Sequence, residues 1–104
     1  MVRISILYPA KIGARFDMDY YINVHVPLAL DRLGSAIKGF NVDVATDAPS
    51  WPKPAFTAMA HYLCDNREAF ETAYGPHAQF LQSDVANYTD IEPITQISDV
   101  RFSR

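Results

Sequence analysis

The sequence predicts an α+β fold with one antiparallel sheet and two helical segments. Segments that alternate apolar and polar residues, as half-buried strands do, are found at 2–8, 40–45, 55–64 and 94–102. Segments that repeat apolar residues every three or four positions, as helices do, are found at 17–34 and 65–90. The order is βαββαβ, the ferredoxin-like arrangement of a four-stranded antiparallel sheet with two helices on one face. The length of 104 residues suits a single domain spanning 1–104.

The first strand and the first helix have clear boundaries. The run from Val2 to Tyr8 places β-branched residues on one face, and Pro9 ends it. Asp17 is a typical N-cap, and Gly34 is a typical C-terminal stop, so a helix is expected between them.

A proline interrupts this helix. Pro27 has no N–H group, and its ring clashes with the carbonyl of Asn23 at a cost of about 3 kcal/mol. It also pushes Val26 away from helical backbone angles. We expect a break here that sets the orientation of His25 and leaves a backbone carbonyl free near it.

The second and third strands are joined by an irregular loop, 48–54, which holds three prolines and Trp51. Both faces of the third strand are largely apolar, so we expect both to be covered. The face opposite the helices is predicted to carry Leu7, Met59, Leu63 and Ile97. With 49% hydrophobic residues in a small chain, this predicts a homodimer formed through the sheet face.

The second helical segment is predicted to be broken. Asp65 with Glu68 resembles a capping box, and Gly75 with Pro76 interrupts the helix. Its stripe toward the sheet is predicted to contain Phe70, Ala73, His77, Phe80, Asp84 and Tyr88.

Composition argues against several classes of function. The net charge of −3 and the scattered basic residues argue against nucleic-acid binding. No apolar run approaches the roughly 20 residues that span a bilayer, and no signal-peptide pattern precedes Pro9. The single cysteine, Cys64, fits a reducing compartment, so a cytoplasmic location is expected. Three histidines without metal-ligand spacing and four scattered glycines predict no metal and no bound cofactor.

His25 and Asp84 are the candidate catalytic residues. A neutral imidazole beside apolar surface can move a proton near neutral pH, although a core histidine bonded to a backbone carbonyl would fit as well. Asp84 lies in an apolar stripe, where a carboxylate needs a partner. It could meet His25 across two packed helices and orient the imidazole, or it could cap the turn that follows.

Aromatic residues with polar ends are the candidates for binding a substrate, although each could equally be ordinary core or surface. The predicted substrate-binding residues are Tyr20, Tyr21, Trp51, His77, Phe80 and Tyr88. Helix periodicity leaves open which of Tyr20 and Tyr21 points inward.

Two segments carry a resemblance to a known family. The segment FDMDYYINVHVPLA and the later segment SDVANYTDIEP resemble the EthD family, and the likeness extends over essentially the whole chain. It implies a dimeric α+β barrel, two ferredoxin-like subunits paired sheet to sheet. The positions that match the family are Tyr20, Tyr21, His25, Pro27, Asp84, Asn87, Tyr88 and Thr89.

The resemblance and the residues together lead to three functional hypotheses. The first is an enzyme that uses His25 as a general base on a small, largely apolar molecule, by cofactor-free oxygenation, isomerisation or lyase chemistry. The second is a non-catalytic binding protein or an accessory subunit of an oxygenase system. The third, by analogy of fold alone, is haem binding with His77 as axial ligand.

Overall fold

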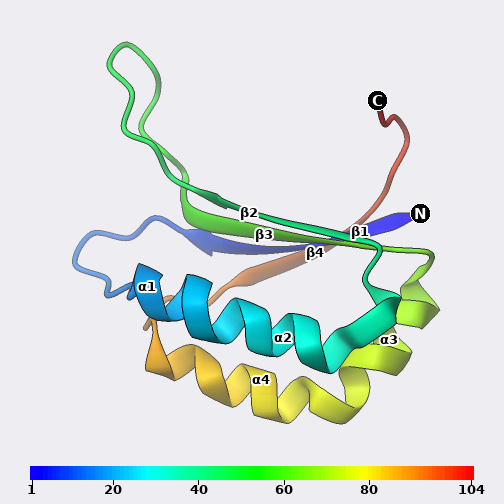
Figure 1. Cartoon of the computed structure of the whole chain (residues 1–104). Helices are drawn as coiled ribbons and strands as arrows, with labels where there is room; N and C mark the ends of the chain where they lie inside the picture. The colour runs from blue at the N-terminus through cyan, green and yellow to red at the C-terminus, as the bar shows by residue number, and fades with distance from the viewer.

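Four antiparallel strands form one sheet, and all the helices lie on one of its faces (Figure 1). The structure is a computed structural model that describes all residues, 1–104. The strands are β1 (Val2–Pro9), β2 (Gly39–Val44), β3 (Phe56–Cys64) and β4 (Ile94–Asp99). They lie in the order β2-β3-β1-β4, and every neighbouring pair is antiparallel. The predicted ferredoxin-like fold is confirmed.

Each of the two predicted helical segments is a chain of short helices. The first contains α1 (Met18–Tyr20), a π-helical turn (Tyr21–His25), α2 (Val26–Leu33) and a 3₁₀ turn (Gly34–Ala36). The second contains α3 (Arg67–Tyr74), a 3₁₀ turn (Gly75–His77), α4 (Ala78–Asp84) and a second 3₁₀ turn (Val85–Asn87). No helix is both long enough and apolar enough to cross a membrane.

The caps agree with the sequence at one helix and differ at the other. The Asp17 carboxylate accepts a hydrogen bond from the backbone N–H of Tyr20, as predicted. At α3 the N-cap is Asn66, whose side-chain oxygen accepts from the N–H of Ala69, so the predicted capping box from Asp65 is wrong by one residue. Asn and Asp cap helices about equally well, so residue type could not decide between adjacent positions.

Pro27 does not break the first helical segment. Val26 keeps helical backbone angles, φ −61° and ψ −51°, so the predicted departure at this residue is wrong. The chain instead widens into a π-helical turn before the proline, where the N–H of Val26 donates to the carbonyl of Tyr21, five residues earlier. Pro27 then lies in the first turn of α2, where a missing N–H costs little. His25 is the last residue of this π-helical turn. Its position therefore depends on the change of helix pitch that precedes Pro27.

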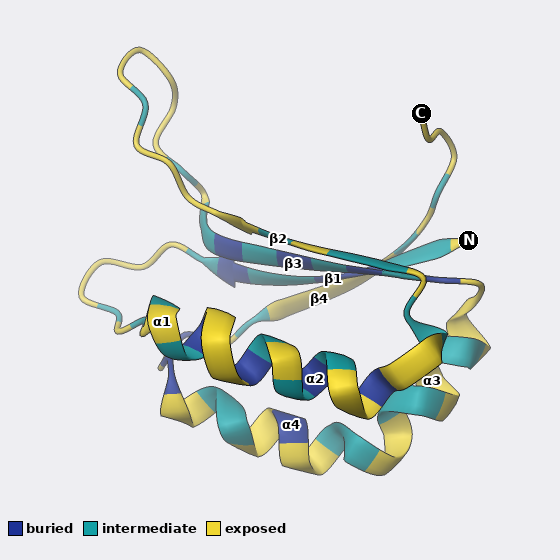
Figure 2. Ribbon diagram, in the orientation of Figure 1, coloured by how far each residue is buried: buried dark blue, intermediate teal, exposed yellow.

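The helix-facing side of the sheet forms the core. Buried residues there include Ile4, Ala60, Tyr62 and Cys64, and Leu33 of α2 packs against them. Figure 2 shows the helices buried or half-buried on some sides and exposed on others. Ile97 lies on this side, because it pairs with Ile4. Its predicted placement on the open face is therefore wrong.

The open face of the sheet is part apolar and part polar. Ile94 pairs with Leu7, which pairs with Met59, and these three side chains share the open face with Leu63. Between them the hydroxyl of Ser5 lies 2.7 Å from Nδ1 of His61.

The second helical segment changes phase at its break. Leu81 is buried, whereas Phe80 is 44% exposed and lies beneath the guanidinium of Arg32 at 4.5 Å. The 3₁₀ turn Gly75–His77 rotates further per residue than an α-helix does, so a stripe extrapolated through it shifts around the axis. The prediction that Phe80 faces the sheet is wrong for this reason.

Candidate functional site

The candidate site is centred on a contact between the two helical segments. Nδ1 of His25 lies 2.8 Å from Oδ2 of Asp84. Both side chains are about 10% exposed. His25 comes from the end of the π-helical turn, and Asp84 is the last residue of α4.

Asp84 is held by hydrogen bonds to both of its oxygens. Its second oxygen, Oδ1, accepts from the hydroxyl of Tyr20 at 2.7 Å and from the side-chain amide of Asn87 at 2.9 Å. Burial by itself raises the pKa of a carboxyl group. Here the hydrogen bonds from His25, Asn87 and Tyr20 outweigh burial and hold the pKa of Asp84 below its ordinary value. The carboxylate therefore stays ionised, and it raises the pKa of the Tyr20 phenol.

The ionised Asp84 fixes the tautomer of His25. A carboxylate can only accept hydrogen bonds, so Nδ1 of His25 carries the proton, and in the neutral ring Nε2 is a free acceptor. Nε2 makes no hydrogen bond within the protein, and the chain has no buried side-chain nitrogen or oxygen without a partner. Nε2 is therefore accessible from outside the packed protein.

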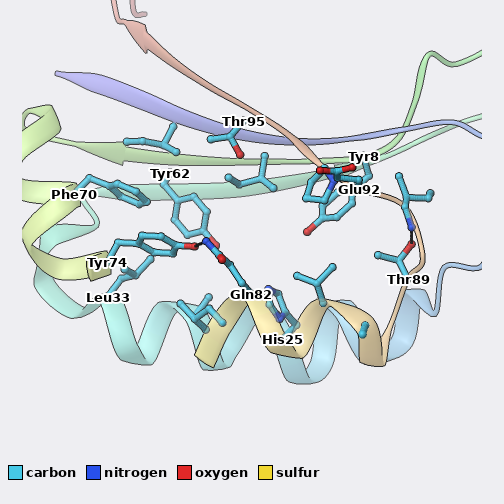
Figure 3. A pocket seen from close by; sticks show the side chains of 18 of the residues that line it. Tyr8, His25, Leu33, Tyr62, Phe70, Tyr74, Gln82, Thr89, Glu92 and Thr95 are labelled. Carbon is cyan, nitrogen blue, oxygen red and sulfur yellow. Dashed lines mark hydrogen bonds between the residues drawn. The ribbon is translucent and has the colours of Figure 1, made fainter. Parts of the chain in front are cut away.

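His25 lines a cavity of about 730 Å³ between the helices and the sheet (Figure 3). The volume falls within the usual range for small-molecule sites, and most of the 19 lining residues are hydrophobic. The sheet contributes residues such as Ile4, Ile6 and Tyr8, and α4 contributes Leu81 and Gln82. The Gln82 amide donates to the hydroxyl of Tyr74 at 3.1 Å.

Two aromatic rings that do not line the cavity pack against the His25 imidazole. The Tyr21 ring stacks on the imidazole, with centroids 5.9 Å apart, and the Tyr88 ring lies 4.7 Å from it. The Tyr8 and Tyr88 hydroxyls are 2.5 Å apart. Burial raises the pKa of Tyr8, Tyr21 and Tyr88, so these phenols stay protonated. With Phe16 they form a rigid layer that fixes the position of the imidazole.

The structure brings together five of the eight predicted site residues. His25 and Asp84 are in contact, Tyr20 binds Asp84, and Tyr21 and Tyr88 pack against His25. Of the two adjacent tyrosines, Tyr21 points inward and is buried in the core, whereas the hydroxyl of Tyr20 donates to the Asp84 carboxylate. None of the three tyrosines lines the cavity itself.

The other three predicted residues lie elsewhere. Trp51 is 77% exposed in the loop between β2 and β3, which extends beyond the sheet (Figure 1). His77 ends the 3₁₀ turn between α3 and α4, and Phe80 contacts Arg32 on the surface. None of the three lines the cavity, so the structure does not bring them together with His25 there. The loop points away from the cavity, and the 3₁₀ turn alters the helix phase.

Several lining residues were missed by the sequence argument. Tyr8 alternates with Ile4 and Ile6 on the inward face of β1, and this pattern could have identified it. Gln82, Asp90 and Glu92 carry no such signal, because they are exposed residues of a helix end and a loop that only tertiary packing brings to the cavity. No cluster of three His, Cys, Asp or Glu side chains is placed to hold a metal ion.

Comparisons with known proteins relate the chain to a family. The model of the EthD domain matches residues 12–92. An EthD-like protein from Ralstonia eutropha is 40% identical, with a TM-score of 0.90 over 99% of this chain and 94% of that one. No curated protein matches the chain.

More distant structures share the fold. An EthD family protein from Bacillus halodurans is 18% identical, with a TM-score of 0.74 over 96% of this chain and 98% of that one. A dimeric protein of ferredoxin-like fold from Bacteroides fragilis is 10% identical, with a TM-score of 0.61 over 95% of each chain. The family model covers most of the chain, and the Ralstonia relative is similar over nearly all of it, so this chain belongs to the EthD family.

Proposed function

We propose that this EthD family protein binds a small, largely apolar organic molecule in the helix–sheet cavity and removes a proton from it, with His25 as general base. The observation that carries the proposal is the 2.8 Å contact between Nδ1 of His25 and Asp84, which leaves Nε2 of this cavity-lining residue without a partner in the protein. A base needs a fixed tautomer, a partner that stabilises its protonated form, and access to the substrate. The contact with Asp84 supports the first two, and the place of His25 in the cavity lining supports the third.

The chemistry follows from this arrangement. Nε2 takes a proton from an acidic C–H or O–H group, and the electron pair of the broken bond stays on the substrate as an enolate or phenolate. The imidazolium that forms is stabilised by Asp84, whose own position is fixed by Tyr20 and Asn87. Return of the proton to another atom is an isomerisation, and loss of a leaving group is a lyase reaction. Reaction of the anion with dioxygen would be a cofactor-free oxygenation.

We also propose that two chains pair through the open sheet face. Four apolar side chains, Leu7, Met59, Leu63 and Ile94, lie on this face, and a partner would remove them from water. The Bacteroides structure with the same fold is described as dimeric, which supports the proposal. The cavity lies on the other side of the sheet, so pairing would leave it open.

Hydrogen–deuterium exchange at carbon tests the base directly. Naphthyl methyl ketone is incubated with protein in D₂O, and loss of its methyl proton signal is followed by NMR. We expect exchange above the buffer rate in the native protein and exchange at the buffer rate alone in His25→Gln. The control His77→Gln alters a histidine outside the cavity and should exchange at the native rate.

The non-catalytic hypothesis predicts a different result. The ketone would raise the melting temperature by binding the folded state, yet the native protein would not accelerate exchange. Equal exchange in the native protein and in His25→Gln would also contradict the assignment of His25 as the base.

A further inference from the structure

The cavity is lined by carboxylates but by no lysine or arginine. Of the 19 residues that line it, none is Lys or Arg. Two exposed carboxylates, Asp90 and Glu92, line it where the chain runs from the second helical segment into β4, and the ionised Asp84 lies behind His25. The nearby Arg15 does not line the cavity, and its guanidinium donates to the carbonyl of Ala86. No lysine or arginine side chain therefore lines the cavity to pair with a bound anion.

The direction of the hydrogen bond between Tyr8 and Tyr88 follows from which of the two lines the cavity. Tyr88 is completely buried, and its hydroxyl forms one hydrogen bond, to the hydroxyl of Tyr8. If Tyr8 donated, the Tyr88 proton would be left buried and unpaired, which is costly. Tyr8 is only 2% exposed, but it lines the cavity, whereas Tyr88 does not. Donation by Tyr88 therefore leaves the proton of the Tyr8 hydroxyl for an acceptor in the cavity. Burial raises the pKa of Tyr8, so the proton is retained near neutral pH.

Tyr8 and His25 present complementary groups to the same space. Tyr8 comes from the sheet and His25 from the helices, on opposite sides of the cavity (Figure 3). Both rings pack on Tyr88, with centroid distances of 6.0 Å and 4.7 Å. The cavity thus has a hydrogen-bond donor on its sheet side and a base on its helix side, each fixed by the same buried ring.

We propose that the substrate is an uncharged carbonyl compound with an acidic C–H group beside the carbonyl, that Tyr8 donates its hydrogen bond to the carbonyl oxygen, and that carboxylates are excluded. This inference rests on the proposed function of His25. As the C–H bond breaks, its proton moves to Nε2 of His25, its electron pair forms the enolate double bond, and the carbonyl π electrons move onto oxygen. Tyr8 stabilises the negative charge that develops there.

Carboxylates are excluded because ionised groups lose hydration on entering an apolar cavity and need a compensating cation. None lines this one, and Asp90 and Glu92 repel an anion. An uncharged ketone avoids this cost and gains the Tyr8 hydrogen bond.

Three ligands with the same ring and different substituents test the recognition. They are naphthyl methyl ketone, ethylnaphthalene and naphthoate, and affinities are measured by NMR titration. We expect the ketone to bind about three- to tenfold tighter than ethylnaphthalene, the range for one hydrogen bond. We expect naphthoate to bind at least about tenfold more weakly than the ketone, and to bind more tightly in Asp90→Asn and Glu92→Gln.

The Tyr8→Phe variant should bind the ketone and ethylnaphthalene equally and should slow ketone exchange. The double variant Tyr8→Phe/Tyr88→Phe, which leaves no hydroxyl unpaired, provides the same test if the single variant is unstable. Tyr74→Phe, which removes another hydroxyl of the cavity, should keep the preference for the ketone.

The outcomes separate this inference from the function on which it rests. If Tyr8→Phe keeps the ketone preference, or naphthoate binds as tightly as the ketone, the substrate class is wrong even when His25→Gln abolishes exchange. If the preference for the ketone depends on Tyr8 but the native protein catalyses no exchange, the proposed carbonyl recognition is supported and the proposal of His25 as the base is wrong. If none of the three ligands binds, both proposals are wrong.

Discussion

His25 and Asp84 are 59 residues apart in the chain, yet their side chains meet at 2.8 Å. The contact joins the π-helical turn of the first helical segment to the last residue of α4. It is made inside a shell of hydrogen bonds and aromatic rings, so its geometry is fixed before any ligand binds. Pre-organisation of this kind is what the proposed proton transfer requires, and an ordinary surface ion pair lacks it.

Replacing Asp84 by Asn should make stability less sensitive to acid. The pKa of Asp84 is lower in the folded protein than its ordinary value, so ionisation stabilises the fold above that ordinary value. This contribution is lost as pH falls through the folded pKa, so below the ordinary pKa of a carboxyl group the native protein should lose stability more steeply than Asp84→Asn.

Urea unfolding at neutral and acidic pH measures the difference. At neutral pH we expect the variant to be less stable by about 1–3 kcal/mol, since three donors lose a charged acceptor. Asp19→Asn, which alters an exposed acid of the first helix, is the control and should follow the native pH profile. Parallel profiles for native protein and Asp84→Asn would show that Asp84 titrates as in an unfolded chain.

Replacing Tyr20 by Phe should raise the pKa of Asp84 toward its ordinary value, because one of its three donors is lost. We expect the exchange rate to fall about two- to tenfold, the effect of one hydrogen bond on a positioning group. The carboxyl carbon chemical shift of Asp84, followed by NMR against pH, measures the titration. In Tyr74→Phe, which removes a hydroxyl remote from Asp84, the titration should be unchanged.

Adjacent residues of α4 should respond very differently to truncation. Leu81 is buried, so Leu81→Ala should cost about 2–5 kcal/mol of stability. Phe80 is 44% exposed and loses mainly its contact with Arg32, so Phe80→Ala should cost about 0.5–1 kcal/mol. Thermal and urea unfolding of the two variants test the change of helix phase. A larger loss of stability in Phe80→Ala than in Leu81→Ala would mean that Phe80 faces the sheet, as expected from the sequence.

A charge on the open sheet face should separate the proposed dimer. Light scattering of the native protein should give about twice the chain mass of 11.7 kDa, and Met59→Asp should give the monomer mass or aggregate, because a carboxylate would be buried between two sheets. Val24→Asp places the same charge on an exposed helix position and should remain dimeric. A stable Met59→Asp dimer would mean that the chains pair through another surface.

The strands show how far a periodic pattern can be extended. Alternation predicted all four strands, and the register confirms the assignment of Leu7, Met59 and Leu63 to one face, since period two leaves little freedom. It failed for Ile97 in β4, an edge strand that is mostly exposed, where burial imposes little pattern on the sequence. The same strand ends at Asp99, earlier than the predicted 102.

The helices show a second limit. Helical periodicity holds only while the pitch is constant, and both segments change pitch, at the π-helical turn before Pro27 and at the 3₁₀ turn after Tyr74. A proline in the sequence signals that something must change, but not whether the helix bends, breaks or widens. Phe80, which follows the 3₁₀ turn, was therefore placed on the wrong face.

By itself the sequence determined the βαββαβ order, the family, and the chemical character of His25 and Asp84. Local patterns carry this information, because strand and helix periods and capping residues act over a few positions. Only the tertiary structure decided that the imidazole and the carboxylate touch, that Tyr8 lines the same cavity as His25, and that Trp51 does not. These relationships depend on how two helical segments of changing pitch pack on one sheet, and no short stretch of chain encodes that geometry.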